Sequence, residues 1–207
     1  MHSHYSADSS ITPKDLVSFA KRCGLDGVAV TDHDRLDGAL RIATETDFLV
    51  VPGIEITSSN GHVVGLNVQE LIPRGLTVNE TVDKIHESGG IAIACHPVGL
   101  FKGGLGKLTN SEFDAVEVIN SSAIPFNYTV RQNERIASRL GKARVAGSDA
   151  HYGPEIGCAH TLIDAEFSAD DVVKAISKGL CQPFGRAIPI TVRLRRILAV
   201  RTKKFQP

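Results

Sequence analysis

Residues 27–34 are Gly-Val-Ala-Val-Thr-Asp-His-Asp, a short apolar run that ends abruptly in charged and imidazole side chains. Small and β-branched residues in such a run predict a buried strand. This strand would deliver Asp32, His33 and Asp34 to its C-terminal end. The same pattern recurs along the chain, where short apolar runs lead into Glu55, Cys95-His96-Pro97 and Asp149-Ala150-His151.

Segments with a helical spacing of apolar residues alternate with these strands. The first begins with Thr12-Pro13, an N-cap followed by a first-turn proline, and ends at Gly24. The Asn60-Gly61 pair predicts a hairpin between the strands on either side of it. We expect helices over 11–23, 36–46, 77–88, 127–140 and 169–178, and strands over 27–31, 48–54, 62–68, 91–94, 115–119, 143–146 and 160–163.

About seven strands that alternate with helices predict a parallel α/β architecture, and this number favours a closed or nearly closed barrel over an open sheet. Functional residues of such barrels lie at the C-terminal ends of the strands. The His, Asp and Glu residues of the motifs above occupy these positions. We therefore expect the functional site at this end of the barrel.

The composition is that of one medium-sized domain. Lys and Arg number 23 and Asp and Glu number 23, and this balance argues against a strongly basic nucleic-acid-binding protein. The four cysteines form no Cys-x-x-Cys pair, so neither a zinc knuckle nor a disulfide framework is indicated. The sequence contains no apolar run of membrane-spanning length and no signal-peptide pattern, which predicts a soluble, cytoplasmic protein without membrane insertion.

The first eight residues, Met-His-Ser-His-Tyr-Ser-Ala-Asp, add a second ligand pattern. On an extended segment His2 and His4 point to the same side, and the carboxylate of Asp8 follows four residues later. Imidazole and carboxylate together suit Zn, Mn or Fe. A disordered terminus is the alternative, but the ligand-type residues that recur after the strands favour a metal site.

The ligand-type motifs therefore follow one another in the order His2-Ser3-His4 with Asp8, Thr31-Asp32-His33-Asp34, Pro52-Gly53-Ile54-Glu55, His62, Cys95-His96-Pro97 and Gly147-Ser148-Asp149-Ala150-His151. In this order and with these gaps, the chain resembles the PHP (polymerase and histidinol phosphatase) family of metal-dependent phosphoesterases over most of its length. It is most similar to the branch of nucleotide and oligonucleotide phosphatases, in which an Asp, here Asp8, replaces a His of histidinol-phosphatase-like relatives.

The resemblance implies a distorted (β/α)7 barrel that holds two or three divalent metal ions. The family usually has a short apolar strand and an Asp before the His-x-His motif, whereas this chain begins at Met1. We therefore expect the first strand to be largely missing at the N-terminus, because the start is truncated or the initiation site is misassigned.

The ligands that the resemblance implies are all imidazoles or carboxylates. A first metal would take His2, His4, Glu55 and Asp149, a second would share Glu55 and add His62 and His96, and a third would take Asp8, His33 and His151. Of these, Asp149, Glu55 and His33 are expected to act in catalysis. Asp32 and Asp34 are expected to orient neighbouring ligands.

Three side chains near these motifs are candidate substrate contacts. Arg35 adjoins a ligand motif, Lys102 lies in a glycine-containing loop with Lys107, and Asn120 follows a strand. A solvated loop lysine is the commoner alternative for Lys102 and Lys107. Cys95 is expected to be a small buried side chain and not a nucleophile, because no base or positive charge that would lower the thiol pKa is evident.

The last part of the chain differs in composition. Over 186–207, basic residues are interleaved with apolar ones and no acidic residue is present. We therefore divide the chain into a phosphoesterase domain over 1–185 and a basic C-terminal tail or helix over 186–207. The tail could bind a nucleic-acid backbone, an acidic partner or a membrane surface. The interleaved apolar residues favour another interpretation, a packed terminal helix that buries them and extends its arginines.

Two functions fit these motifs. The first is a hydrolase that uses metal-activated water to cleave a phosphomonoester or a terminal phosphodiester of a small nucleotide or short oligonucleotide, as a phosphatase or an exonuclease. The second is a non-catalytic PHP module that serves as a nucleic-acid-binding or scaffold subunit. Degenerate modules tend to lose ligand positions, whereas here every position except the Asp before the His-x-His motif is filled. The sequence therefore favours an enzyme.

Overall fold

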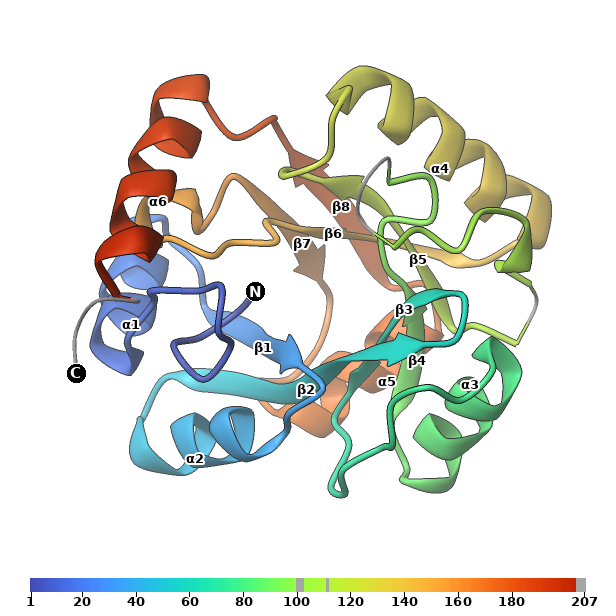
Figure 1. The fold of residues 1–207 in the computed structure, drawn as a ribbon. Coiled ribbons are helices and arrows are strands. Elements are labelled where there is room, and N and C mark those ends of the chain that lie inside the picture. The colour runs from blue at the N-terminus through green and yellow to red at the C-terminus, as the bar shows by residue number, and fades with distance from the viewer. Residues whose placement is uncertain (100–102, 111, 204–207) are drawn as a thin grey trace.

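Six strands form one curved sheet in the order β1-β2-β3-β4-β5-β6 in the computed structural model, which describes residues 1–99, 103–110 and 112–203 (Figure 1). Strand β3 runs antiparallel to both neighbours, and the other neighbouring strands are parallel. The strands are β1 (Gly27–His33), β2 (Leu49–Ser58), β3 (Gly61–Leu66), β4 (Ile91–Ala94), β5 (Ala115–Asn120) and β6 (Ala143–Gly147).

Helices surround the curved sheet (Figure 1). Helix α2 packs on β2, α3 on β3 and β4, α4 on β5, and α5 on β2 and β6. Among the described residues, no helix combines the length and the apolar character that crossing a membrane requires. The α-helices are α1 (Pro13–Arg22), α2 (Asp37–Glu45), α3 (Val78–Glu87), α4 (Phe126–Leu140), α5 (Ala169–Ser177) and α6 (Ile190–Lys203), and the short 3-10 helices are η1 (Gly106–Leu108) and η2 (Gly153–Glu155).

A separate antiparallel pair, β7 (Ala159–Ile163) and β8 (Cys181–Gly185), lies against β6. Its contact with β6 includes the Thr161 hydroxyl, which accepts a hydrogen bond from Ala146 N (2.8 Å) and donates one to Ala146 O (3.0 Å). The sequence pattern did not predict β8. The strand contains Pro183 and is largely exposed, so it lacks the apolar run that marks a buried strand.

The N-terminal residues lie between β1 and the loop after β6. The amino group of Met1 donates to Ala29 O (3.1 Å), and Thr31 N donates to Met1 O (2.9 Å). On the other side, His2 N donates to Ala150 O (2.9 Å). The predicted distorted α/β barrel is confirmed, and Met1 and His2 are hydrogen-bonded between β1 and the loop after β6.

Local signals account for the starts of α1 and α3. The Thr12 side chain accepts from Asp15 N while the Asp15 carboxylate accepts from Thr12 N, and Thr77 and Glu80 form the same reciprocal cap at the start of α3.

Strands β1 and β2 extend beyond their predicted ends at 31 and 54. Their parallel pairing continues to His33 opposite Glu55, so these two residues belong to the sheet.

Helix α6 occupies the predicted tail, but the expectation that its apolar residues are buried is wrong. Ile190, Leu194, Ile197 and Leu198 are exposed, whereas Arg193 and Arg196 are partly buried. The guanidinium groups face the protein because buried carbonyl and carboxylate acceptors lie beneath them. Residues 204–207 of the tail lie outside the described part of the chain.

The apolar core offers a test of the fold. Phe113 is fully buried at 0% exposure in the main cluster, so Phe113→Ala should lower the free energy of unfolding by about 3–5 kcal/mol. Phe167 is 64% exposed, and Phe167→Ala should change this free energy by no more than about 0.5 kcal/mol. Denaturant unfolding followed by circular dichroism measures both. Equal losses for the two variants would contradict the core placement of Phe113.

Candidate metal centre

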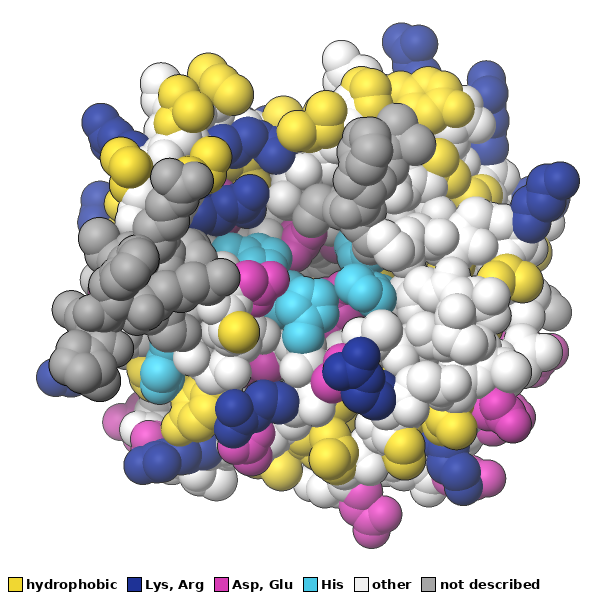
Figure 2. Space-filling model, viewed as in Figure 1, with side chains coloured by type: hydrophobic (Ala, Val, Ile, Leu, Met, Phe, Trp, Pro, Cys, Tyr) yellow, Lys and Arg dark blue, Asp and Glu magenta, His cyan; other side chains and the backbone are white. Residues whose placement is uncertain are grey.

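Histidine and acidic side chains gather at the centre of the face viewed in Figure 2, at the C-terminal ends of the parallel strands. Within the described part of the chain, their possible ligand atoms form four groups, and the atoms of each group all lie within 4.8 Å of one another. The groups are His2/His33/His151, His33/Glu55/His62, Glu55/Cys95/His96 and His2/Glu55/Asp149. Because the groups share members, they make one continuous cluster of donors.

Glu55 on β2 connects most of the cluster. Its Oε1 lies 2.7 Å from His62 Nδ1 and 3.3 Å from His96 Nε2, and its Oε2 lies 3.2 Å from His2 Nε2. Burial by itself would raise the pKa of Glu55, but the hydrogen bonds from these three imidazoles outweigh it and hold the pKa well below its ordinary value. Glu55 is therefore an ionised carboxylate in a buried position.

The sheet register explains why distant residues meet at Glu55. His33 is the parallel partner of Glu55, and His33 Nδ1 lies 3.9 Å from Glu55 Oε1. Thr57 faces the same side of β2 as Glu55, and the hairpin places His62 opposite Thr57. The hairpin predicted at Asn60-Gly61 thus places His62 beside the carboxylate of Glu55.

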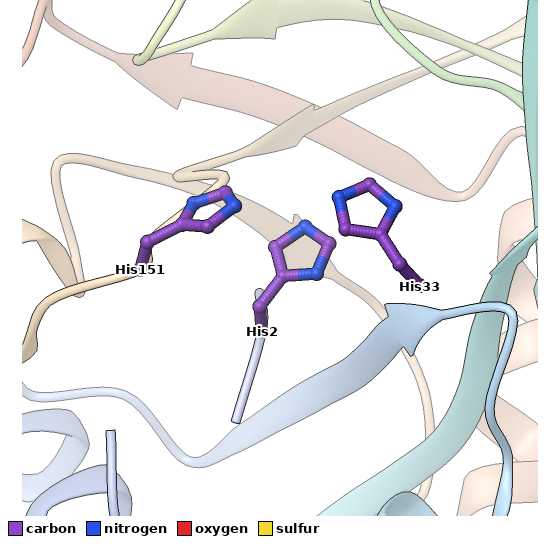
Figure 3. A group of neighbouring side chains, drawn as sticks. All are labelled: His2, His33 and His151. Carbon is purple, nitrogen blue, oxygen red and sulfur yellow. The ribbon is translucent and has the colours of Figure 1, made fainter. Parts of the chain in front are cut away.

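His2 lies between the two buried carboxylates. Its Nε2 is 3.2 Å from Glu55 Oε2 and 3.3 Å from Asp149 Oδ1. Burial lowers the pKa of His2, but the hydrogen bonds to Asp149 and Glu55 raise it to about 9. Figure 3 shows its ring between those of His33 and His151, with centroid separations of 4.4 and 4.2 Å.

This donor set fits divalent metal ions. Imidazoles stacked at ring-contact distance repel one another when protonated, whereas a shared cation bound to neutral rings removes that repulsion. The Nδ1 atoms of His2 and His96 are also buried without a hydrogen-bond partner among the described residues. Buried polar atoms normally have a partner, so these two nitrogen atoms are free to interact with a group that the protein itself does not supply.

Asp8 completes the exposed side of the cluster. Its Oδ2 lies 3.2 Å from His151 Nε2 and 3.7 Å from His33 Nε2. The other nitrogen of His151, Nδ1, lies 2.9 Å from the carbonyl oxygen of Asp149, which orients the ring. Burial raises the pKa of Asp8, but the hydrogen bond with His151 outweighs this and lowers it below its ordinary value. The three residues implied for a third ion are thus neighbours.

His4 and Cys95 differ from the other members. His4 belongs to none of the four groups, and its ring packs against Tyr5 with a centroid separation of 4.4 Å. Its assignment to the first metal stays a prediction. The Cys95 thiol donates to His62 O (3.2 Å), and burial raises its pKa to about 12. Cys95 therefore contributes a neutral thiol that supports the hairpin.

Glu117 is a site residue that the sequence pattern did not reveal, because it stands in the middle of an apolar strand. Its Oε2 accepts hydrogen bonds from His96 N (2.7 Å) and from the Asn120 side chain (3.1 Å), which also donates to Asp149 Oδ2 (3.3 Å). His96 and Asp149 have positive φ values of 33° and 49°, which non-glycine residues rarely adopt. Glu117 and Asn120 therefore hold two ligand residues in an unusual backbone conformation. Glu117 Oε1 lies so close to Gly147 that a side chain at position 147 would collide with it.

Asp32 and Asp34 act on the chain around the ligands. Asp32 is fully buried and accepts hydrogen bonds from Ser3 N (2.6 Å) and Ser3 Oγ (2.6 Å), which fixes the turn between His2 and His4. Asp34 accepts from Thr57 N (2.7 Å) and Thr57 Oγ1 (2.9 Å), which anchors the end of β2 beyond Glu55. Both contacts orient ligand-bearing segments.

Two of the candidate substrate contacts have other partners. Arg35 pairs with Asp37 through two hydrogen bonds of 3.0 and 2.7 Å, and the Asn120 amide is committed to Glu117 and Asp149. Lys102 lies outside the described residues, and Lys107 is exposed on η1. Contact between these side chains and a substrate stays a prediction.

Metal analysis tests the cluster. We expect metal-replete protein to retain about two or three divalent ions per chain after dialysis. Glu55→Ala should lose at least about one of them, because Glu55 belongs to three of the four ligand groups. Glu70→Ala removes an exposed carboxylate and serves as the matched control. Elemental analysis that finds the same metal content in both variants would refute the role of Glu55.

Comparisons with known proteins show what the chain is similar to. A family model described as PHP-associated matches residues 128–181. Two uncharacterized proteins of Methanocaldococcus jannaschii are similar to the chain: one is 38% identical over 118 residues (55% of this chain and 69% of the relative), and the other is 32% identical over 161 residues (73% and 63%).

A crystal structure of a two-domain protein from Bacteroides vulgatus, which contains a predicted PHP-like metal-dependent phosphoesterase, has the same fold. It matches with a TM-score of 0.70 over 96% of this chain and 67% of that chain, at 18% sequence identity. The motifs along the sequence, the distorted barrel and the cluster of imidazoles and carboxylates at its strand ends lead to one conclusion. The chain belongs to the PHP family.

Proposed function

We propose that the protein is a metal-dependent phosphoesterase that hydrolyses a phosphomonoester or a terminal phosphodiester of a small nucleotide or short oligonucleotide. The observation that carries the proposal is the set of four overlapping ligand groups, three of which contain Glu55. Carboxylates and imidazoles that converge in this way suit Zn, Mn or Fe. The presence of imidazole or carboxylate at each implied ligand position supports catalysis over a scaffold role.

The residues that would hold two or three ions are those of the cluster: His2, Asp8, His33, Glu55, His62, His96, Asp149 and His151. Ions held there supply Lewis-acid activation of water and neutralise charge on the phosphate. Without such neutralisation, the carboxylates of Asp8, Glu55 and Asp149 repel a phosphate ester. Substrate binding is therefore expected to depend on the ions as strongly as the chemical step does.

The cluster has a buried side and an open side, which assigns roles to its members. Glu55, His2 and His96 are buried, whereas the side chains of Asp8 and His33 are 52% and 31% exposed. We place the substrate on the open side, next to Asp8 and His33. Burial lowers the pKa of His33, which favours its neutral form at neutral pH.

Asp149 is the proposed proton acceptor. Its Oδ2 accepts a hydrogen bond from Asn120, and its Oδ1 lies 3.3 Å from His2 Nε2, so both oxygens are held in place. A buried carboxylate that is fixed in this way beside the other ligands can accept a proton from attacking water. The nucleotide class rests on the resemblance at Asp8, where histidinol-phosphatase-like relatives have a histidine.

A panel of nucleoside monophosphates, short oligonucleotides and other phosphate esters, assayed with Zn, Mn and Fe, tests the proposal. We expect release of phosphate or of a terminal nucleotide, with loss of activity on chelation and recovery on adding metal. No turnover of any phosphate ester by metal-replete protein would overturn the proposal.

The variant Asp149→Asn should fold normally and lower kcat by at least about 100-fold, because it removes a negative ligand and a proton acceptor. The matched control is Asp164→Asn, which makes the same change at an exposed position. Steady-state kinetics compares the two. Ordinary turnover by Asp149→Asn would rule out this role for the carboxylate.

A further inference from the structure

Helix α6 directs two arginines toward the loops that carry the metal cluster. The Arg193 guanidinium donates to Ser121 O (2.9 Å) and Ser122 O (3.0 Å), in the segment that follows Asn120 at the end of β5. It also donates to Ile188 O (3.1 Å). These contacts hold α6 over the end of β5. Figure 2 shows Lys and Arg side chains beside the histidine cluster on the side of α6.

The second arginine, Arg196, faces a fully buried carboxylate. Its Nη1 lies 3.4 Å from Glu155 Oε1, and the Glu155 side chain is 0% exposed. This oxygen has no hydrogen-bond partner of good geometry among the described residues, so Arg196 offsets its charge mainly through proximity. A buried carboxylate that loses its cation is strongly unfavourable. The position of Glu155 therefore depends on Arg196.

The other oxygen of Glu155 determines the main chain at the metal cluster. Glu155 Oε2 accepts hydrogen bonds from His151 N (2.9 Å) and Tyr152 N (3.2 Å). His151 in turn packs its ring on His2 and places its Nε2 3.2 Å from Asp8. A continuous series of contacts thus joins α6 to a ligand on the open side of the cluster.

We propose that Arg196 and Glu155 are positioning residues through which helix α6 orients His151 for metal binding. If Arg196 is removed, the Glu155 carboxylate is left buried without a counter-charge and moves away from its position. This movement breaks the hydrogen bond to His151 N and frees the imidazole. The exposure of Ile190, Leu194 and Leu198 agrees with a helix that is held through its arginines.

The first test compares Arg196→Met with Arg195→Met in the full-length protein. Arg195 is exposed on the same helix, so its variant is a matched control. In metal-free protein, Arg196→Met should speed hydrogen exchange of the His151 and Tyr152 amides by at least about 10-fold relative to the core strands. In calorimetric titration with Mn²⁺, it should weaken the binding of one ion by about 10- to 100-fold. The Arg195→Met protein should behave as wild type in both measurements.

A rescue experiment separates positioning from general stability. Glu155→Gln keeps an oxygen that can accept from His151 N but carries no charge, so it needs no cation. The double variant Arg196→Met/Glu155→Gln should therefore recover slow exchange at His151 and most of the Mn²⁺ affinity. The proposal is overturned if Arg196→Met matches Arg195→Met, if it speeds exchange equally throughout the protein, or if the double variant shows no recovery.

The positioning role of Arg196 and Glu155 rests on the proposed metal centre, but its test is independent of phosphoesterase activity. Both measurements use no substrate, and hydrogen exchange uses no metal. If the exchange pattern and the rescue are as expected but no phosphate ester is hydrolysed, the positioning role stands and the proposed reaction is lost. If instead the protein hydrolyses phosphate esters and its Arg196→Met variant behaves as wild type, the proposed reaction stands and the positioning role of Arg196 and Glu155 is lost.

Discussion

The ionised carboxylate of Glu55, buried among imidazoles, is the constraint on which the rest of the structure depends. A carboxylate in an apolar interior takes up a proton unless it has ionic or hydrogen-bonding partners. Here the partners come from the N-terminal segment, from the β2–β3 hairpin and from the end of β4. The curvature of the sheet and the hairpin register are what bring these partners to one point.

Three other carboxylates share one function, which is to fix the main chain of a segment that carries ligands. Glu117 accepts from His96 N, Glu155 accepts from His151 N, and Asp32 accepts from Ser3 N. An amide that leaves the sheet at a strand end needs another acceptor. A buried carboxylate satisfies that amide and, because its own position is fixed by packing, also determines where the histidine lies. The same groups can sustain backbone conformations such as the positive φ of His96.

Much of the fold followed from local pattern. Helices α1 and α3 begin directly after Thr12 and Thr77 because each of these capping residues has an acidic partner three residues later in the sequence. Buried strands such as β1 are marked by their own apolar residues. Strand β8 has no such mark, since it is an exposed edge strand whose pairing with β7 depends on distant residues. The orientation of α6 was also missed, because interleaved basic and apolar residues suit either orientation until the neighbouring acceptors are known.

The sequence by itself determined the type of most elements and the chemistry of the ligands, because strand burial, helix caps and donor atoms are properties of short segments. It placed His33, Glu55, His96 and Asp149 at strand ends and so indicated a shared site. Only the tertiary structure decided which donors are neighbours: it joined His2 to Asp149, separated His4 from the four groups, and gave Glu117 and Glu155 their roles. The contacts of His2 with Asp149 and of His96 with Glu117 link residues that are far apart in sequence, and Glu155 receives its cation from the distant helix α6. Their physical cause is the sheet register and the burial of charge, and neither can be recognised before the chain is folded.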